Sequence, residues 1–320
     1  MQHQTIIGID IGGTKCAVAL GTTDGKILSR QSIPTDGDRS SPLEVLEKLT
    51  AIARDLLVTT KGAEKPAGVG VSCGGPLDTK TGVIHTPPNL PEWKAVPVRA
   101  FFEKALSLPV RVENDANATA LAEWKYGAGK GTRNFVFLTM GTGIGGGMIL
   151  DGKLYRGTND LAGEIGHQTV LMNGPLCGCG KRGCLEALAS GPAIARLARE
   201  SMLYGRHKRV LALAGGRAAD ITAAHVVEAA NDGDPFARQI LDEAGTYMGI
   251  GIANVIQIIN PERIALGTIA VHAGDHILNP IRAAVAEYAW KRSSDVCEIL
   301  PAALGDKAQD LAAIALWASE

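Results

Sequence analysis

The chain has 320 residues, of which 46% are hydrophobic and 39 are glycine, so it can bury a substantial core and is long enough for two lobes. Its formal net charge of −1 excludes the strongly basic balance of a typical nucleic-acid-binding protein. The one dense basic run, Arg206, His207, Lys208 and Arg209, is expected to be a solvated turn, and no nucleic-acid partner is expected.

The first residues, "MQHQTIIGIDIGG", carry no basic region, apolar region or cleavage site of a secretory signal, so we do not expect secretion. The longest apolar stretch, Met248 to Ile259, is too short to cross a bilayer and includes Asn254 and Gln257. It is expected to be a buried helix. We therefore expect a cytoplasmic protein with no membrane partner and with reduced thiols, in which structural disulfides are not expected.

Two segments share one pattern of strands and turns. The first, "TIIGIDIGGTKCAVALGTTDGKIL", predicts a strand, a turn at Gly12 and Gly13, a strand from Cys16 to Leu20, and a turn at "TTDGK" before a third strand. The second, "NFVFLTMGTGIGGGMILDGKLY", repeats this order with its turn at Gly141 to Gly147. Both glycine-rich turns are thus expected inside β-hairpins.

The segments between and after these hairpins alternate short strands with helices. "SPLEVLEKLTAIARDLL" predicts a helix with Ser41 and Glu44 as a capping box, and "DPFARQILDEAGTYMGIGIANVIQIIN" predicts a long one. "AGVGVSC", "PVRVEN" and "RIALGT" predict strands. Strands followed by helices, twice over, indicate two related α/β lobes that face each other across a cleft, with a boundary near residue 118.

Two nucleotide-binding motifs are matched only in part. Gly141, Gly143 and Gly146 have the spacing of the dinucleotide fingerprint, but the sequence that follows predicts a strand where that fingerprint needs a helix. Gly147 to Lys153 approach a Walker A loop, but Leu154 replaces the Ser or Thr that binds Mg²⁺. Neither a nicotinamide site nor a P-loop is expected.

The two glycine-rich hairpin turns can still bind phosphate, because glycine lets backbone N–H groups approach an anion closely. Asp10, Thr14 and Lys15 in the first turn suit a metal-bound water, a phosphate hydrogen bond and a counter-charge, and Thr142 adds a hydroxyl in the second. Either turn alone is explained as well by a simple tight turn. The matched pair, one in each lobe, favours phosphate binding.

A third feature is "ENDAN", residues 113–117, between a strand that ends at Val112 and a helical pattern from Ala116 to Trp124. Asn114 and Asp115 therefore lie at a helix N-terminus, where both residue types commonly serve as N-caps. An N-cap does not account for two carboxylates and two amides together. At a cleft edge, one carboxylate could act as a base toward a hydroxyl that an amide holds in position.

With "DIGGTK", "ENDANA", "GEIGHQ" and "CGCGKRGCLE" in this order, the chain resembles the ROK family of bacterial sugar kinases and sugar-responsive repressors over essentially its whole length. The resemblance implies an actin-like, hexokinase-like ATPase fold with two ribonuclease H-like lobes and a central cleft. Residues 1–118 would form the N-terminal lobe, joined by a last helix at about 306–320, and residues 119–305 the C-terminal lobe.

The resemblance also implies a role for each matching residue. Asp115 corresponds to the general base of the family, which takes the proton of the attacking sugar hydroxyl. The positions that bind the hexose are Gly75, Asn89, Asn114, Asp115, Glu164, His167 and Glu186. The positions that bind the nucleotide are Asp10, Gly12, Gly13, Thr14, Lys15, Thr142, Gly143 and Gly267.

The chain departs from the family pattern in two places. Thr268 follows Gly267 where a glycine pair is usual, and its β-branched side chain is expected to reshape the nucleotide pocket. Gly74, Gly75 and Pro76 replace the common Pro-Gly-Pro of the sugar loop, which bears on the sugar preference.

Cys177, Cys179 and Cys184, with His167 ahead of them, supply three thiolates and an imidazole, a set that suits tetrahedral Zn²⁺ although the spacing is not that of a standard finger. The resemblance implies a structural zinc site here, which would hold the loop rigid for Glu186. His167 is expected to use one ring nitrogen for zinc and the other for the sugar. Cys16, Cys73 and Cys297 are expected to be small apolar residues of the interior.

We therefore expect an ATP-dependent hexose kinase, similar to a glucokinase, that uses Mg²⁺, contains structural Zn²⁺ and forms a homodimer. N-acetylmannosamine, N-acetylglucosamine, fructose and allose remain alternative substrates. A sugar-responsive regulator is a rival, but such regulators carry a winged-helix module ahead of the first phosphate loop, which here begins by Ile7. A catalytically silent sugar-binding protein is a third alternative, which Asp115 and the two phosphate loops disfavour.

Overall fold

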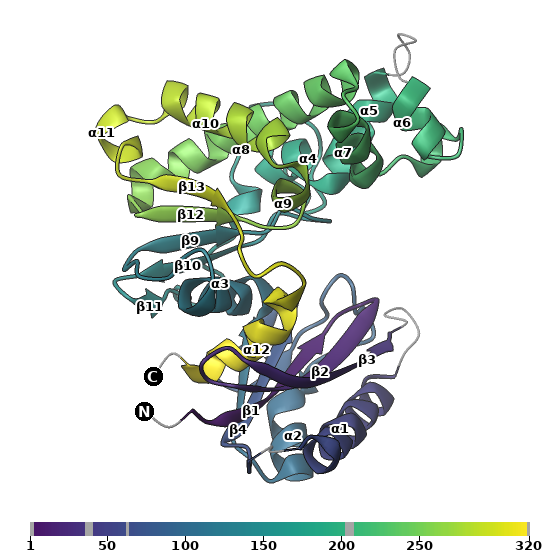
Figure 1. Ribbon diagram of the computed structural model, residues 1–320, viewed down its shortest axis with the longest axis vertical. Helices are drawn as coiled ribbons and strands as arrows, with labels where there is room; N and C mark the ends of the chain where they lie inside the picture. The colour runs from purple at the N-terminus through teal and green to yellow at the C-terminus, as the bar shows by residue number, and fades with distance from the viewer. Residues whose placement is uncertain (1–2, 36–40, 62–63, 202–207, 319–320) are drawn as a thin grey trace.

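The computed structural model describes residues 3–35, 41–61, 64–201 and 208–318, and it has two α/β lobes that are stacked along the long axis of the molecule (Figure 1). Arg206 and His207 of the basic run lie outside the described residues. The two lobes confirm the fold class expected from the sequence.

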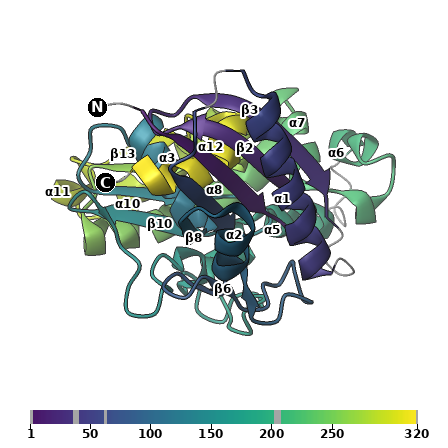
Figure 2. The same cartoon turned by 90° about the horizontal axis from the view of Figure 1, so that it is seen from below.

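The first lobe is built on a five-stranded sheet of order β3-β2-β1-β4-β8. β1 (Thr5–Ile11), β2 (Lys15–Thr22) and β3 (Ile27–Pro34) are antiparallel, whereas β4 (Gly68–Cys73) and β8 (Val110–Asn114) run parallel to β1. α1 (Pro42–Thr59) and α2 (Val98–Leu106) cover its outer face, as the view from below shows (Figure 2). A small sheet beside it contains β5 (Leu77–Asp78), β6 (Val83–Ile84) and β7 (Val96–Pro97).

The second lobe has a five-stranded sheet of order β11-β10-β9-β12-β13. Its strands are β9 (Phe135–Leu138), β10 (Gly146–Leu150), β11 (Lys153–Leu154), β12 (Arg263–Leu266) and β13 (Glu298–Pro301). The expected strand after the second glycine turn is β10, which confirms the argument against a dinucleotide fingerprint.

Helices of the second lobe lie above this sheet, and α3 (Asp115–Tyr126) lies below it, toward the first lobe (Figure 1). The apolar stretch at Met248 belongs to α8 (Pro235–Ile259) and is largely buried, as predicted. The other helices are α4 (Leu185–Ala189), α5 (Gly191–Ser201), α6 (Lys208–Leu213), α7 (Ala223–Asn231), α9 (Ile269–Ala273), α10 (Asp275–Tyr288) and α11 (Lys291–Ser294), with short 3-10 turns at Ile165–His167, Ala218–Asp220 and Gly305–Lys307.

The last helix, α12 (Ala308–Ala318), returns from the second lobe and packs on the sheet of the first (Figure 1). Glycines in the strands permit the close approach: a Cβ on Gly8 would lie 3.0 Å from the Ile314 side chain, and one on Gly70 would overlap the Ala313 carbonyl oxygen. The chain therefore crosses between the lobes a second time after β13.

The start of α1 corrects one local expectation. Ser41 occupies the N-cap position, but its side chain makes no capping hydrogen bond, so the predicted capping box with Glu44 is wrong. Pro42 takes the first helical position, where its fixed φ suits a helix start and its missing N–H removes one group that needs a partner.

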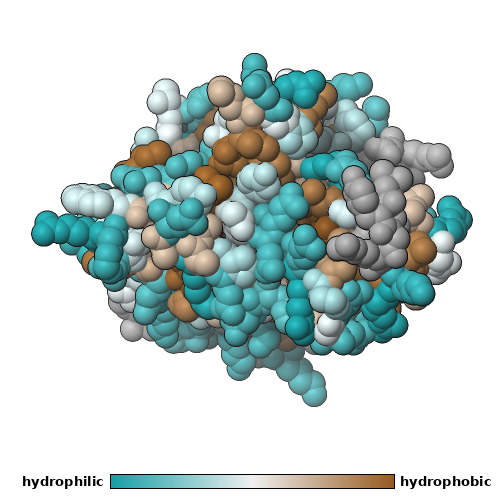
Figure 3. All heavy atoms as spheres, turned by 90° about the horizontal axis from the view of Figure 1, so that it is seen from above, coloured by the Kyte–Doolittle hydropathy of each residue, from teal (hydrophilic) through white to brown (hydrophobic). Residues whose placement is uncertain are grey.

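The face formed by the helices of the second lobe is largely hydrophilic, with separate apolar patches, which is usual for a protein surface (Figure 3). Among the helices of the described residues, none is both long and apolar enough to cross a membrane.

Candidate active site

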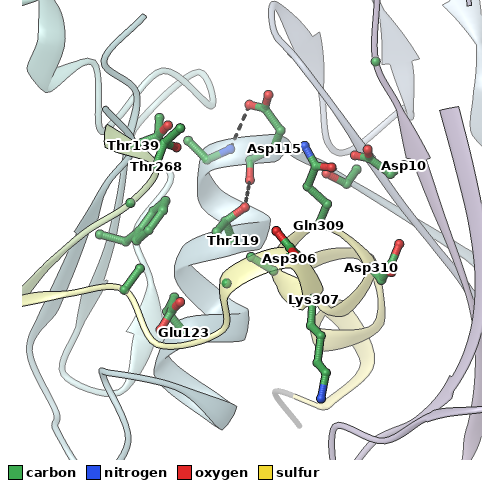
Figure 4. A pocket seen from close by; sticks show the side chains of 18 of the residues that line it. Asp10, Asp115, Thr119, Glu123, Thr139, Thr268, Asp306, Lys307, Gln309 and Asp310 are labelled. Atoms are coloured by element: carbon green, nitrogen blue, oxygen red, sulfur yellow. Dashed lines mark hydrogen bonds between the residues drawn. The ribbon is translucent and has the colours of Figure 1, made fainter. Parts of the chain in front are cut away.

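A cavity of about 870 Å³ lies between the lobes, and α3 and α12 both contribute to its wall (Figure 4). Five of the sequence-predicted residues line it: Asp10, Gly12, Lys15, Asp115 and Gly267. Gly13, Thr14, Thr142 and Gly143 belong to the two glycine turns beside it but are not among its lining residues.

Asn114 and Asp115 lie where β8 passes into α3. The Asn114 side-chain oxygen caps the helix by accepting hydrogen bonds from the N–H groups of Ala116 (2.9 Å) and Asn117 (3.2 Å), as predicted for an N-cap. Its amide nitrogen lies 3.4 Å from the Cβ position of Gly75. The capping oxygen is thus committed to the helix, while the amide group faces the expected sugar loop.

Asp115 accepts the Ala116 N–H at 2.8 Å through one carboxylate oxygen, and the other lies 3.8 Å from the Cβ position of Gly74. Burial raises the pKa of the Asp115 carboxyl above its usual range, although the backbone N–H of Ala116 opposes the shift. A carboxylate with a raised pKa at the edge of a cleft is suited to accept a proton.

Asp10, near the end of β1, is a second carboxylate that lines the cavity. Its burial, followed by the negative charge of Asp115, raises its pKa to about 7, against a hydrogen bond from Ser72. A divalent cation near Asp10 would relieve this repulsion, and carboxylate oxygen is the ligand type that Mg²⁺ prefers. The residues present therefore fit a magnesium-bound nucleotide.

The first glycine turn depends on glycine at two positions. A Cβ on Gly12 would lie 2.7 Å from the Lys15 carbonyl oxygen, and one on Gly13 would overlap the carbonyl oxygen of Asn89. Within the described part of the chain, the backbone N–H groups of Gly13 and Thr14 have no hydrogen-bond partner. The turn thus offers free donors to an anion and also touches the loop that carries Asn89.

The second glycine turn is tied to α4. The Gly141 N–H bonds to the Gly143 carbonyl at 3.0 Å, and the Glu186 carboxylate accepts the Ile144 N–H, also at 3.0 Å. A Cβ on Gly143 would lie 2.5 Å from that carboxylate. Glu186, expected from the sequence at the sugar, thus lies against the second glycine turn.

His167, Cys177, Cys179 and Cys184 come together as one cluster, with one ligand atom of each residue within 4.8 Å of all the others. The His167 Nδ1 lies 3.7 Å from the Cys177 Sγ, and its Nε2 lies 3.8 Å from a Glu164 carboxylate oxygen. This Cys₃His set fits tetrahedral Zn²⁺, and the second imidazole nitrogen lies near Glu164, another residue expected at the hexose. Cys16 and Cys73 are buried and Cys297 is half-buried.

Two contacts between the lobes were not foreseen from the sequence. The Arg156 guanidinium donates to the Glu113 carboxylate at 2.7 Å, and Glu113 is only 1% exposed. The Asp160 carboxylate accepts from both the N–H and the hydroxyl of Thr79 at 3.0 Å. These contacts fix the segment that leads directly to Glu164 and His167.

Several other residues that line the cavity were not among the candidates named from the sequence. The segment before and in α12 enters the cavity only because this helix folds back onto the first lobe (Figure 4). The missed lining residues include Arg30, Thr119, Glu123, Thr139, Val271, His272, Asp306, Lys307, Gln309 and Asp310.

Comparison with known proteins gives consistent results. The sequence model of the ROK family matches residues 6–320. A glucokinase from Halalkalibacterium halodurans is 37% identical over 96% of this chain and 93% of its own length. A xylose repressor from Caldicellulosiruptor bescii is 30% identical over 99% of this chain and 78% of its own length. The crystal structure of a ROK family glucokinase from Streptomyces griseus, in complex with glucose and AMPPNP, superposes with a TM-score of 0.81 at 33% identity and covers 98% of both chains.

Proposed function

Because the chain belongs to the ROK family over nearly its whole length, we propose that it is an ATP-dependent glucokinase, which phosphorylates D-glucose to glucose 6-phosphate. The observation that carries this proposal is the position of Asp115, a carboxylate with a raised pKa that lines the same cavity as the first glycine turn.

In the proposed reaction, Asp115 accepts the proton of the hexose hydroxyl. The hydroxyl oxygen forms a bond to the γ-phosphorus as the bond from that phosphorus to the β–γ bridging oxygen breaks, and ADP leaves. The chain mainly positions the two reactants, since phosphoryl transfer needs little covalent chemistry from the protein. Gly75, Asn89, Asn114, Glu164, His167 and Glu186 are the residues we assign to holding the hexose.

The phosphate chain of ATP is proposed to lie between the two glycine turns, with donors from Gly12, Gly13, Thr14, Thr142 and Gly143, and Gly267 near the adenosine. Lys15 supplies a counter-charge at the cavity wall. We assign Asp10 to holding Mg²⁺, which, when bound with ATP, would neutralise the charge that develops on the phosphate oxygens.

Zn²⁺ is proposed as a structural ion of the loop from His167 to Cys184. The two isolated bridges of this loop, Thr169 with Cys184 and Leu176 with Arg182, give it little regular structure of its own. A metal held by His167, Cys177, Cys179 and Cys184 would fix the loop and with it Glu186.

We also propose the division of the chain into lobes. Residues 1–118, together with residues 306–320, form the N-terminal lobe, and residues 119–305 form the C-terminal lobe.

The first alternative is a kinase for another hexose, namely N-acetylmannosamine, N-acetylglucosamine, fructose or allose. The second is a catalytically silent sugar-responsive regulator, since xylose repressors share the family. Asp115 and residues of the first glycine turn, which has free N–H donors, line one cavity, and this combination favours catalysis.

A coupled ADP-release assay with this panel of hexoses tests the proposal. Glucose is expected to give the highest kcat/KM, and glucose 6-phosphate is expected as the product. A higher kcat/KM with another hexose would show that this hexose, and not glucose, is the preferred substrate. Hexose binding by calorimetry without ADP release from any member of the panel would favour the regulator.

A homodimer remains part of the proposal. Tyr288, Trp290 and Val296 expose apolar side chains near α10 and α11, a surface that a second copy could cover. Light scattering of the purified protein measures the oligomeric state directly, and a monomer at all concentrations would contradict this part.

A further inference from the structure

Thr268 has a backbone conformation that side chains rarely adopt. Its φ is 51° and its ψ is −104°, which lies outside the small left-handed region open to Asn and Asp. Among the described non-glycine residues with positive φ, Thr86 and Thr268 are the β-branched ones. A β-branched residue in this conformation destabilises the fold relative to glycine.

The neighbouring hydrogen bonds explain why Thr268 cannot relax. The Gly267 N–H donates to the Leu138 carbonyl at 2.9 Å, and the Ile269 N–H donates to the Met140 carbonyl at 3.0 Å. The backbone on both sides of Thr268 is therefore fixed, to the last residue of β9 and to the segment directly after it. The sheet imposes the positive φ, and glycine would meet it without strain.

The Thr268 side chain lies at the wall of the cavity, beside Thr139 (Figure 4). The hydroxyls of Thr139 and Thr268 each lie 3.8 Å from the Cβ position of Gly141, in the second phosphate loop. Within the described residues, neither hydroxyl has a hydrogen-bond partner. Two free hydroxyls thus converge on the loop proposed to bind phosphate.

We infer that Thr268 is a nucleotide-binding residue of this chain, whose hydroxyl donates a hydrogen bond to an oxygen of the phosphate chain of ATP. Thr139 provides a second hydroxyl at the same place. The hydrogen bond offsets the backbone strain only when nucleotide is bound, so the residue serves affinity for ATP at the expense of stability. This inference rests on the proposed function for the identity of the nucleotide.

Three variants of Thr268 separate the effect of its hydroxyl on nucleotide affinity from the effect of its backbone strain on stability. Thr268→Val keeps the shape and the β-branching but removes the donor, and it is expected to raise the KM for ATP and the Kd for AMPPNP on the order of tenfold. Thr268→Ser keeps the donor and is expected to raise both by far less. Thr268→Gly removes both the donor and the strain, so its AMPPNP affinity falls as in Thr268→Val while its Tm is no lower than that of the wild type.

Calorimetric titration with AMPPNP, ATP kinetics at saturating glucose, and thermal melts give the three readouts. Thr246→Val, on the exposed face of α8, is the control and is expected to leave all three unchanged. The inference is overturned if Thr268→Val binds AMPPNP within twofold of the wild type, if Thr268→Ser loses as much as Thr268→Val, or if Thr268→Gly melts lower than the wild type.

The titration also separates this inference from the proposed function. A wild type that binds AMPPNP but phosphorylates no hexose would refute the kinase, while the comparison of Thr268→Val with Thr268→Ser would still test the contact. An active wild type with unaffected variants would refute only the contact.

Discussion

Glu123 offers a sharp test of how the two lobes are joined. Its side chain is fully buried in the last turn of α3. The carboxylate accepts hydrogen bonds from the backbone N–H groups of Ala128 (2.8 Å), Ala303 (3.0 Å) and Leu304 (2.9 Å). Ala303 and Leu304 belong to the connection by which the chain leaves β13 for α12 and returns to the first lobe.

Glu123→Ala removes the partner of three backbone donors at once. Each buried donor left without a partner costs about 1–3 kcal/mol, which gives roughly 3–9 kcal/mol if all three stay dry. Because Glu123 forms part of the cavity wall, its truncation lets water reach some of these groups, and we expect a loss of about 3–5 kcal/mol in the free energy of unfolding. Glu123→Gln keeps one oxygen and is expected to lose less.

Urea unfolding of the wild type and the two variants measures these differences. Glu47→Ala, on the exposed face of α1, is the control and should stay within about 0.5 kcal/mol of the wild type. A loss below about 1 kcal/mol for Glu123→Ala would refute the reasoning, because it would mean that the three N–H groups find other partners at little cost.

Three further predictions concern the chemistry and the loops of the site. Burial raises the pKa of the Asp115 carboxyl, so protonation should remove the base as the pH falls through this raised pKa. The kcat/KM for glucose should therefore rise with pH and then level off. A rise centred at or below pH 3.8, the ordinary pKa of an aspartate, would contradict this prediction. Cys184→Ser should lower the zinc content per chain, the Tm and the affinity for glucose but leave AMPPNP binding nearly unchanged, and a metal-free wild type with normal activity would refute the zinc role. Arg156→Met should leave the Glu113 carboxylate without its counter-charge, destabilise the protein by about 2–4 kcal/mol and weaken glucose binding; Arg133→Met, at an exposed ion pair with Asp151, is the control, and equal effects of the two changes would contradict the account.

The parts of the fold that local patterns determine were predictable. The glycine hairpins, the strand after the second turn, α8 and the start of α3 all follow from periodicity and turn residues. The Asn114 cap was predictable because the amide precedes a helical pattern directly. The capping box at Ser41 was not, because Pro42 allows the helix to begin without a side-chain cap.

The parts of the site that depend on distant contacts were not predictable. Asp310 and Gln309 reach the cavity only after α12 packs against Gly8 and Gly70, and no local pattern marks them. The Arg156 and Glu113 pair joins residues of different lobes. The strain at Thr268 could be foreseen only as a departure from a glycine pair, since its φ is set by hydrogen bonds to β9.

The most direct test of the central claim compares the wild type with Asp115→Asn. Glucose-dependent release of ADP, with glucose 6-phosphate measured as the product, reports phosphoryl transfer, and calorimetry with glucose reports binding. The amide keeps the shape of the carboxylate but cannot accept the proton, so we predict that turnover falls by about 10² to 10⁴ while glucose still binds. An Asp115→Asn variant that turns over at close to the wild-type rate would contradict the role of Asp115 as the base.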